Sequence, residues 1–112
     1  MKSLVVIFLL IGAISVFAQS KTDEFKVYGN CGMCETRIEN AAKSVNGVTI
    51  ADWDKETKML KVSYDKSKTD KHKIQEAVAK MGHDTDMHKA DDKVYNALPG
   101  CCKYDRTGTD NK

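Results

Sequence analysis

Four cysteines in two close pairs are the residues of this chain best suited to chemistry. Cys31 and Cys34 enclose a Gly-Met dipeptide, and Cys101 and Cys102 are adjacent. Because each pair is local, a disulfide within it would close a very small loop and remove little entropy from the unfolded chain. Thiolate sulfur selects soft ions, Cu(I) above all, with Hg(II), Cd(II) and Zn(II) also possible. The spacing therefore favours metal or redox chemistry over a structural disulfide.

The first pair is placed to act as a two-thiolate metal site. A helix is expected to begin at Cys34, so Cys31 and Cys34 lie at its amino end. Backbone N–H groups there favour the negative thiolate and help a metal to bind at neutral pH. Two thiolates satisfy a linear ion such as Cu(I) or Hg(II) but leave a tetrahedral Zn(II) ion half-coordinated. Cys31 and Cys34 are therefore the predicted primary ligands.

Two other functions remain open for these cysteines. A periplasmic thiol–disulfide redox protein would form a redox-active Cys31–Cys34 disulfide and would work without metal. However, a thioredoxin-like protein usually carries a cis-proline opposite its thiols, and the single proline of this chain, Pro99, lies in the C-terminal segment. A scaffold or adaptor domain would instead keep stable disulfides and bind no metal.

Three further residues are second-tier candidates for the same site. His83 could offer an imidazole as a third ligand or alter the thiolates through its charge. Cys101 and Cys102 could complete the site with three or four sulfur ligands. They could also bind a second ion, oxidise with the first pair, or form a strained vicinal disulfide. The sequence leaves these possibilities open.

The elements that must position these residues alternate between strands and helices. Alternation of apolar and polar residues predicts the strands, and three- and four-residue spacing of apolar residues predicts the helices. The first helix is expected to bury Ile38, Ala41, Ala42 and Val45, and the second helix Ile74, Ala77, Val78 and Met81. The expected strands are 24–28, 48–53, 58–64 and a weak 85–88, and the expected helices are 34–44, 70–81 and a short 91–98.

The order strand–helix–strand–strand–helix–strand is the split βαβ pattern of ferredoxin-like folds. It predicts an α+β sandwich, with a four-stranded antiparallel sheet, two helices on one face and a short C-terminal extension. In such a fold the Cys31–Cys34 loop and the corner after the second helix lie at the same edge. Gly82-His83-Asp84 is therefore expected close to the thiols.

The N-terminal residues predict export. Residues 1–18 contain 14 hydrophobic residues and a single charge, Lys2, and end in small residues. This pattern is typical of a secretory signal peptide cleaved after Ala18. The protein is then periplasmic or secreted, with no membrane insertion after cleavage. The expected organisation is a signal peptide at 1–18, a metal-binding domain at 19–88, and an extension at 89–112 that carries the vicinal cysteines and is partly disordered.

Composition excludes several functional classes. The chain has 112 residues, so it can form one modest core. Its formal net charge is +2. Acidic and basic residues are interleaved without a basic stripe, which argues against a nucleic-acid partner. The sequence has no recognisable pair of catalytic carboxylates, nucleophile with a base, or phosphate-binding loop, so no enzymatic activity is expected.

Several spaced motifs carry a family resemblance. Cys31-x-x-Cys34, Ile38-Glu39-x-Ala41, Val45-x-Gly47-Val48 and Val62-x-Tyr64-Asp65 resemble the heavy-metal-associated (HMA) domain over about residues 24–88. That family includes copper chaperones, the mercury-binding periplasmic protein and N-terminal modules of metal-transporting P-type ATPases. The resemblance implies a ferredoxin-like fold and soft-metal binding by the two loop cysteines. One departure is Gly29, which stands where the family usually has methionine, while Met33 lies inside the CxxC motif.

Together these features predict an exported metallochaperone or scavenger. It would bind Cu(I) through the CxxC loop and pass it to a metal-transporting protein, such as an ATPase or an efflux component. The alternative within metal binding is a Hg(II) or Zn(II)/Cd(II) binder of a resistance or transport system. The protein is expected to be a monomer or a metal-bridged dimer.

Overall fold

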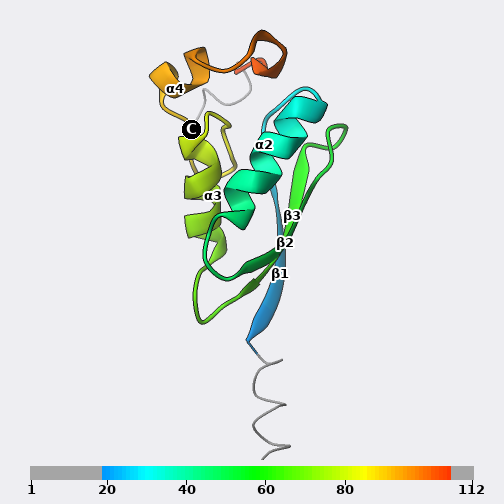
Figure 1. The fold of residues 1–112 in the computed structure, drawn as a ribbon, viewed down its shortest axis with the longest axis vertical. Coiled ribbons are helices and arrows are strands. Elements are labelled where there is room, and N and C mark those ends of the chain that lie inside the picture. Colours follow the sequence, from blue (N-terminus) through cyan, green and yellow to red (C-terminus); the bar gives the residue numbers. More distant parts are fainter. Residues whose placement is uncertain (1–18, 107–112) are drawn as a thin grey trace, which may run out of the picture.

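A three-stranded antiparallel sheet and two helices make the body of the protein, within the described residues 19–106 (Figure 1). In this computed structural model the expected signal peptide, 1–18, lies outside that range. No helix within the range is long and apolar enough to cross a membrane. The elements are β1 (Ser20–Lys26), α2 (Gly32–Lys43), β2 (Val48–Trp53), β3 (Met59–Asp65), α3 (Lys71–Lys80), α4 (Asp92–Asn96) and the 3-10 helix η1 (Gly100–Cys102).

The sheet has the order β1-β3-β2, and both pairings are antiparallel. Phe25 of β1 and Trp53 of β2 flank Leu60 of β3, so three buried side chains form a row across it. Helices α2 and α3 lie side by side on one face of the sheet (Figure 1). The α+β class with two helices on one face is thus confirmed.

Strand β1 begins earlier than the sequence pattern predicts. The expected strand began at residue 24, but residues 20–23 also pair with the second half of β3. Their side chains are largely exposed, and Thr22 and Ser63 join hydroxyl to hydroxyl at 3.0 Å across the two strands. Because little in this stretch is buried, it lacks the alternation of apolar residues that marks a half-buried strand.

The expected fourth strand, residues 85–88, is wrong: this segment is a turn with a single bridge between Val27 and Thr85. The backbone N–H of Thr85 donates to the carbonyl of His88 at 2.7 Å. The Thr85 hydroxyl oxygen also accepts from the N–H groups of Met87 and His88, at 3.3 and 3.0 Å. Threonine hydroxyls compete with regular structure in this way, and here the chain turns instead of extending along β1.

The buried faces of the two helices mostly agree with the sequence pattern. Helix α2 buries Ile38, Ala41 and Ala42 as expected, and also Cys34, whereas Val45 lies beyond its end and is half-buried. Helix α3 buries Ile74 and Val78 as expected, together with Gln75 and Ala79, while Ala77 is only half-buried. The prediction for Met81 is wrong, because its side chain is 41% exposed. Met81 is the C-cap of α3, where the backbone leaves helical geometry and the buried face ends.

Residues 91–106 cross the end of the body where α2 begins and α3 ends; we call them the C-terminal strap (Figure 1). The strap contains α4 and η1, and η1 contacts α2. Leu98 of the strap packs directly on Gly82, whose φ is +106°. A Cβ atom at position 82 would lie 2.9 Å from a Leu98 methyl group, so this position needs glycine for both space and backbone angle.

Candidate metal centre

The CxxC loop lies at the corner between β1 and α2, with Cys31 as the N-cap of the helix. The carbonyl of Cys31 accepts the first helical hydrogen bond, from the N–H of Glu35 at 3.1 Å. Cys34, one turn on, is completely buried, whereas Cys31 is half-buried. Their sulfur atoms are 3.5 Å apart. Two ligands can thus converge on one ion from the same helix end.

The helix end also favours the charged form of Cys31. The backbone N–H of Cys34 bonds the Cys31 sulfur, and a side-chain hydrogen bond joins the sulfurs of Cys31 and Cys101, 3.3 Å apart. Together they lower the pKa of Cys31 to about 6. Since only the thiolate binds metal or acts as a nucleophile, Cys31 is the reactive member of the pair at neutral pH.

The lowered pKa predicts the pH profile of Cys31 alkylation. The thiolate predominates above about pH 6, so the rate with iodoacetamide should be half-maximal near that pH. Below it, the rate should fall roughly tenfold per pH unit as the sulfur is protonated. Peptide mass spectrometry of the metal-free reduced protein gives the rate for each cysteine. A midpoint at the ordinary cysteine pKa of about 8.5 would contradict the prediction.

Trp53 of β2 packs against the residues that lead into the CxxC loop, a role that the sequence pattern did not predict. Its indole Nε1 donates to the carbonyl of Val27 at 3.0 Å, and its side chain is 1% exposed. A Cβ atom on Gly29 would lie 3.1 Å from both the Trp53 ring and the Cβ of Cys34. Lys58 Nζ donates to the carbonyl of Gly29 at 2.7 Å and lies over the Trp53 ring. Trp53 therefore occupies the space beside position 29, which has no side chain.

This packing predicts that Gly29 and Gly32 tolerate alanine differently. Gly29→Ala should reduce the free energy of unfolding by about 1–3 kcal/mol, because the added methyl overpacks against Trp53 and Cys34. Gly32→Ala is the matched control in the same loop, since nothing lies within 4 Å of its Cβ position. Urea denaturation of the two variants and the wild type measures the difference. Equal stability of the two variants would refute the packing role of Gly29.

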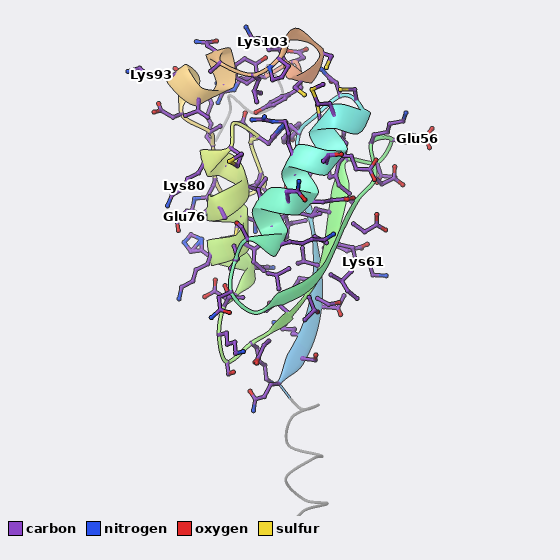
Figure 2. The ribbon with its side chains drawn as sticks, in the orientation of Figure 1. Glu56, Lys61, Glu76, Lys80, Lys93 and Lys103 are labelled. Carbon is purple, nitrogen blue, oxygen red and sulfur yellow. The ribbon has the colours of Figure 1, made fainter. Side chains whose placement is uncertain are left out.

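The strap brings the second cysteine pair onto the first. Cys101 Sγ is 3.3 Å from Cys31 Sγ, and the sulfurs of Cys31, Cys101 and Cys102 all lie within 4.8 Å of one another. Figure 2 shows sulfur atoms gathered where the start of α2 meets the strap. None of the four thiols forms a disulfide. The hydrogen bond to Cys31 raises the pKa of Cys101, and burial raises the pKa of Cys102.

His83 is completely buried and is not in that cluster of ligand atoms. Its Nδ1 donates to the carbonyl of Tyr28 at 2.8 Å, and its ring stacks on Tyr104 of the strap, with centroids 5.7 Å apart. Nε2 makes no hydrogen bond with any described residue. Burial lowers the pKa of His83 and favours the neutral imidazole. The corner after α3 therefore contacts the strap directly, through the His83 ring.

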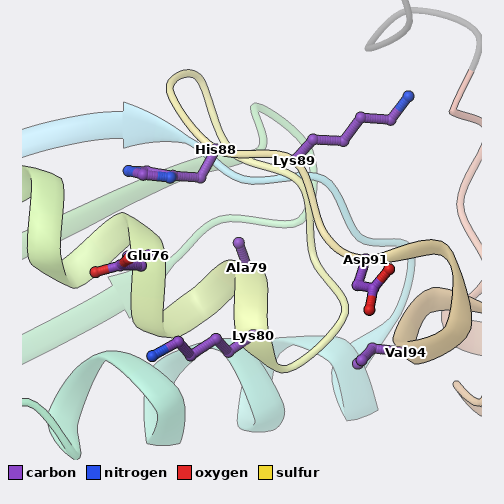
Figure 3. A pocket seen from close by; sticks show the side chains of 7 residues that line it. All are labelled: Glu76, Ala79, Lys80, His88, Lys89, Asp91 and Val94. Atoms are coloured by element: carbon purple, nitrogen blue, oxygen red, sulfur yellow. The ribbon is translucent and has the colours of Figure 1, made fainter.

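A pocket between α3 and the segment leading into α4 offers different chemistry (Figure 3). Side chains of both charges line it, and it contains no cysteine. Its lining residues are Glu76, Ala79, Lys80, His88, Lys89, Asp91 and Val94. The cysteines of the described chain thus lie at the CxxC corner and not in this pocket.

An α+β domain with a CxxC motif at its first strand–helix corner defines a class of small soft-metal-binding proteins. The model of the heavy-metal-associated domain matches residues 25–84. The chain belongs to this family, which confirms the resemblance seen in the sequence. The matched range includes Cys31 and Cys34 but ends before the strap.

Three relatives illustrate the family. Copper chaperone CopZ of Staphylococcus aureus (strain JH9) is 34% identical over 55 residues, 49% of this chain and 81% of that protein. Oxidized MerP from Ralstonia metallidurans CH34 is 30% identical with a TM-score of 0.56, covering 59% of this chain and 93% of that one. The N-terminal domain of a potential copper-translocating P-type ATPase from Bacillus subtilis, in the Cu(I)-loaded state, is 27% identical with a TM-score of 0.56, covering 59% and 84%. The protein is therefore a metal-binding domain related to copper chaperones and to MerP.

Proposed function

We propose that this protein is an exported Cu(I) chaperone that binds the ion through Cys31 and Cys34 and passes it to a metal-transporting partner. The observation that carries the proposal is the pair of sulfurs 3.5 Å apart at the start of α2, one of them with its pKa lowered to about 6. Soft thiolates prefer Cu(I) among the ions available to such a site. The relation to a copper chaperone supports the same ion.

Export and partner are parts of the same proposal. The apolar residues 1–18 support cleavage of a signal peptide after Ala18. The similarity to a domain of a copper-translocating ATPase supports a transporter as partner. Cys31 is half-buried, so a partner thiol could reach an ion held there. Transfer would then proceed while one sulfur of this protein still holds the ion.

Metal competition tests the proposed ion. The full chain is expressed in a Gram-negative host, and the exported fraction is expected to yield a protein that begins at Gln19. After anaerobic reduction, this protein is mixed with equal amounts of Cu(I), Hg(II), Zn(II) and Cd(II). Native mass spectrometry then reports which ion is retained. We expect Cu(I), and we expect Cys31→Ser to lose it.

Each other outcome names a different function. Retention of Hg(II) in place of Cu(I) would identify a mercury scavenger, which the relation to MerP makes the second candidate. Retention of no ion would contradict metal binding and favour thiol–disulfide exchange. Recovery of an uncleaved protein from the cytoplasm would contradict the proposed export but not the proposed metal binding. Transfer is measured by mixing the Cu(I)-loaded protein with a purified N-terminal domain of a copper-translocating ATPase.

A further inference from the structure

The C-terminal strap holds two thiols against the CxxC loop, and the established family features do not account for them. We propose that Cys101 and Cys102 are metal ligands, which together with Cys31 and Cys34 form one site of four sulfurs. The ion would then have three or four sulfur ligands instead of two. This inference rests on the proposed metal binding by the CxxC loop and adds the strap as its second half.

The strap is held in place by contacts that do not involve sulfur. The Tyr104 hydroxyl donates to the carbonyl of Gly82 at 2.8 Å and accepts from the N–H of Asp84 at 2.8 Å. Arg106 donates from two nitrogens to the carboxylate of Asp84, at 3.0 and 2.9 Å. Tyr104 and Asp84 are 3% and 1% exposed. Because such buried polar groups are costly to leave unpaired, these bonds fix the strap and its cysteines over the loop.

The sulfur positions suit one shared ion. A tetrahedral ion with sulfur ligands at about 2.3 Å separates its sulfurs by roughly 3.8 Å. Cys31 lies 3.5 Å from Cys34 and 3.3 Å from Cys101, and Cys102 lies within 4.8 Å of Cys31 and Cys101. Three of the sulfurs, those of Cys31, Cys101 and Cys102, already form a group that could hold an ion, and Cys34 lies outside that group although it is 3.5 Å from Cys31. A four-sulfur site therefore requires side-chain rotation that brings Cys34 closer to the strap cysteines.

Burial differs among the four sulfurs in a way that suits capture and release. Cys34 and Cys102 are both fully buried, one from each side of the contact between α2 and the strap. Cys101 is exposed and Cys31 is half-buried. The buried pair would hold the ion on the inner side. Cys31 and Cys101 lie on the more accessible side of the site, where a thiol of the acceptor can replace the Cys101 sulfur.

Four sulfurs also widen the range of ions. Two thiolates suit linear Cu(I) or Hg(II), whereas Zn(II) and Cd(II) require four ligands. With the strap docked, the site can coordinate Cd(II) fully, and it can hold Cu(I) with a third sulfur. Cd(II) is therefore a useful probe, because its number of sulfur ligands directly reports whether the strap takes part.

X-ray absorption at the cadmium edge counts those ligands. For the reduced, Cd(II)-loaded protein we expect four sulfurs, and for the double variant Cys101→Ser/Cys102→Ser we expect two. The affinity for Cd(II) should fall at least a hundredfold, on the order of what loss of one or two thiolates predicts. Cys101→Ser alone should give three sulfurs. Because Cys101 is exposed, this single variant should keep its fold.

Lys103→Ala is the matched control, since Lys103 is an exposed residue of the same strap (Figure 2). It should keep four sulfurs and wild-type affinity. Two sulfurs in the wild type, with Cys101→Ser unchanged and Cys31→Ser unable to bind, would overturn the strap site and leave the CxxC site intact. Binding unaffected by Cys31→Ser would instead contradict the proposed function itself.

Discussion

Cys31→Ser is expected to lower the affinity for Cu(I) by on the order of a hundredfold to a thousandfold. A structural zinc site of four ligands binds with about 10–16 kcal/mol, or roughly 2.5–4 kcal/mol for each ligand. Since 1.4 kcal/mol corresponds to a factor of about ten, loss of one thiolate predicts two to three orders of magnitude. Competition with a Cu(I) chelator of known affinity, under anaerobic conditions, measures the change.

Met33→Ala provides the control for Cys31→Ser within the same loop. The side chain of Met33 is 53% exposed, so its removal should change neither the fold nor the affinity by more than a few-fold. Circular dichroism of both variants checks that the helices remain intact. Equal affinities of the wild type and Cys31→Ser would show that Cys31 is not a ligand. A large loss with Met33→Ala would show that the thioether contributes to binding.

The order of the elements and the CxxC corner could be predicted from the sequence because both depend on local patterns. The apolar spacing that includes Ile38 and Ala42 predicted the buried face of α2, and that including Ile74 and Val78 predicted most of the buried face of α3. The turn at Thr85 could not be found in this way. The Thr85 segment can form a turn through its hydroxyl or a strand through its backbone. Which of the two forms depends on the hydrogen bonds that the neighbouring strand offers.

The strap was beyond prediction for a different reason. Tyr104 and Arg106 look like residues of a polar tail, and their importance comes from Gly82 and Asp84, some twenty residues earlier. No spacing rule connects such distant positions in a single sequence. Trp53 was missed likewise, because its support of the loop becomes visible only when β2 lies beside position 29. The two cysteine pairs could be recognised, but their meeting depends on these contacts.

Arg106→Ala is expected to release the strap from the body. Asp84 is 1% exposed, and its carboxylate accepts two hydrogen bonds from Arg106. In the variant both bonds are lost, and the buried carboxylate still accepts from the N–H of Ala90 at 2.7 Å. Removing one partner of a buried ion pair costs about 3–5 kcal/mol. Docking of the strap should therefore weaken by on the order of a hundredfold to several thousandfold.

Release of the strap can be followed at Cys102, which is fully buried when the strap is docked. In Arg106→Ala, alkylation of Cys102 should accelerate, measured at pH 8.5 by peptide mass spectrometry. The pKa of Cys31 should also rise, because its side-chain hydrogen bond with Cys101 helps to keep it low. In the background of Asp84→Asn, the same Arg106→Ala change should have a much smaller effect, since the buried charge is already gone. An unreactive Cys102 in Arg106→Ala would mean that packing by Leu98 and Tyr104 holds the strap without the ion pair.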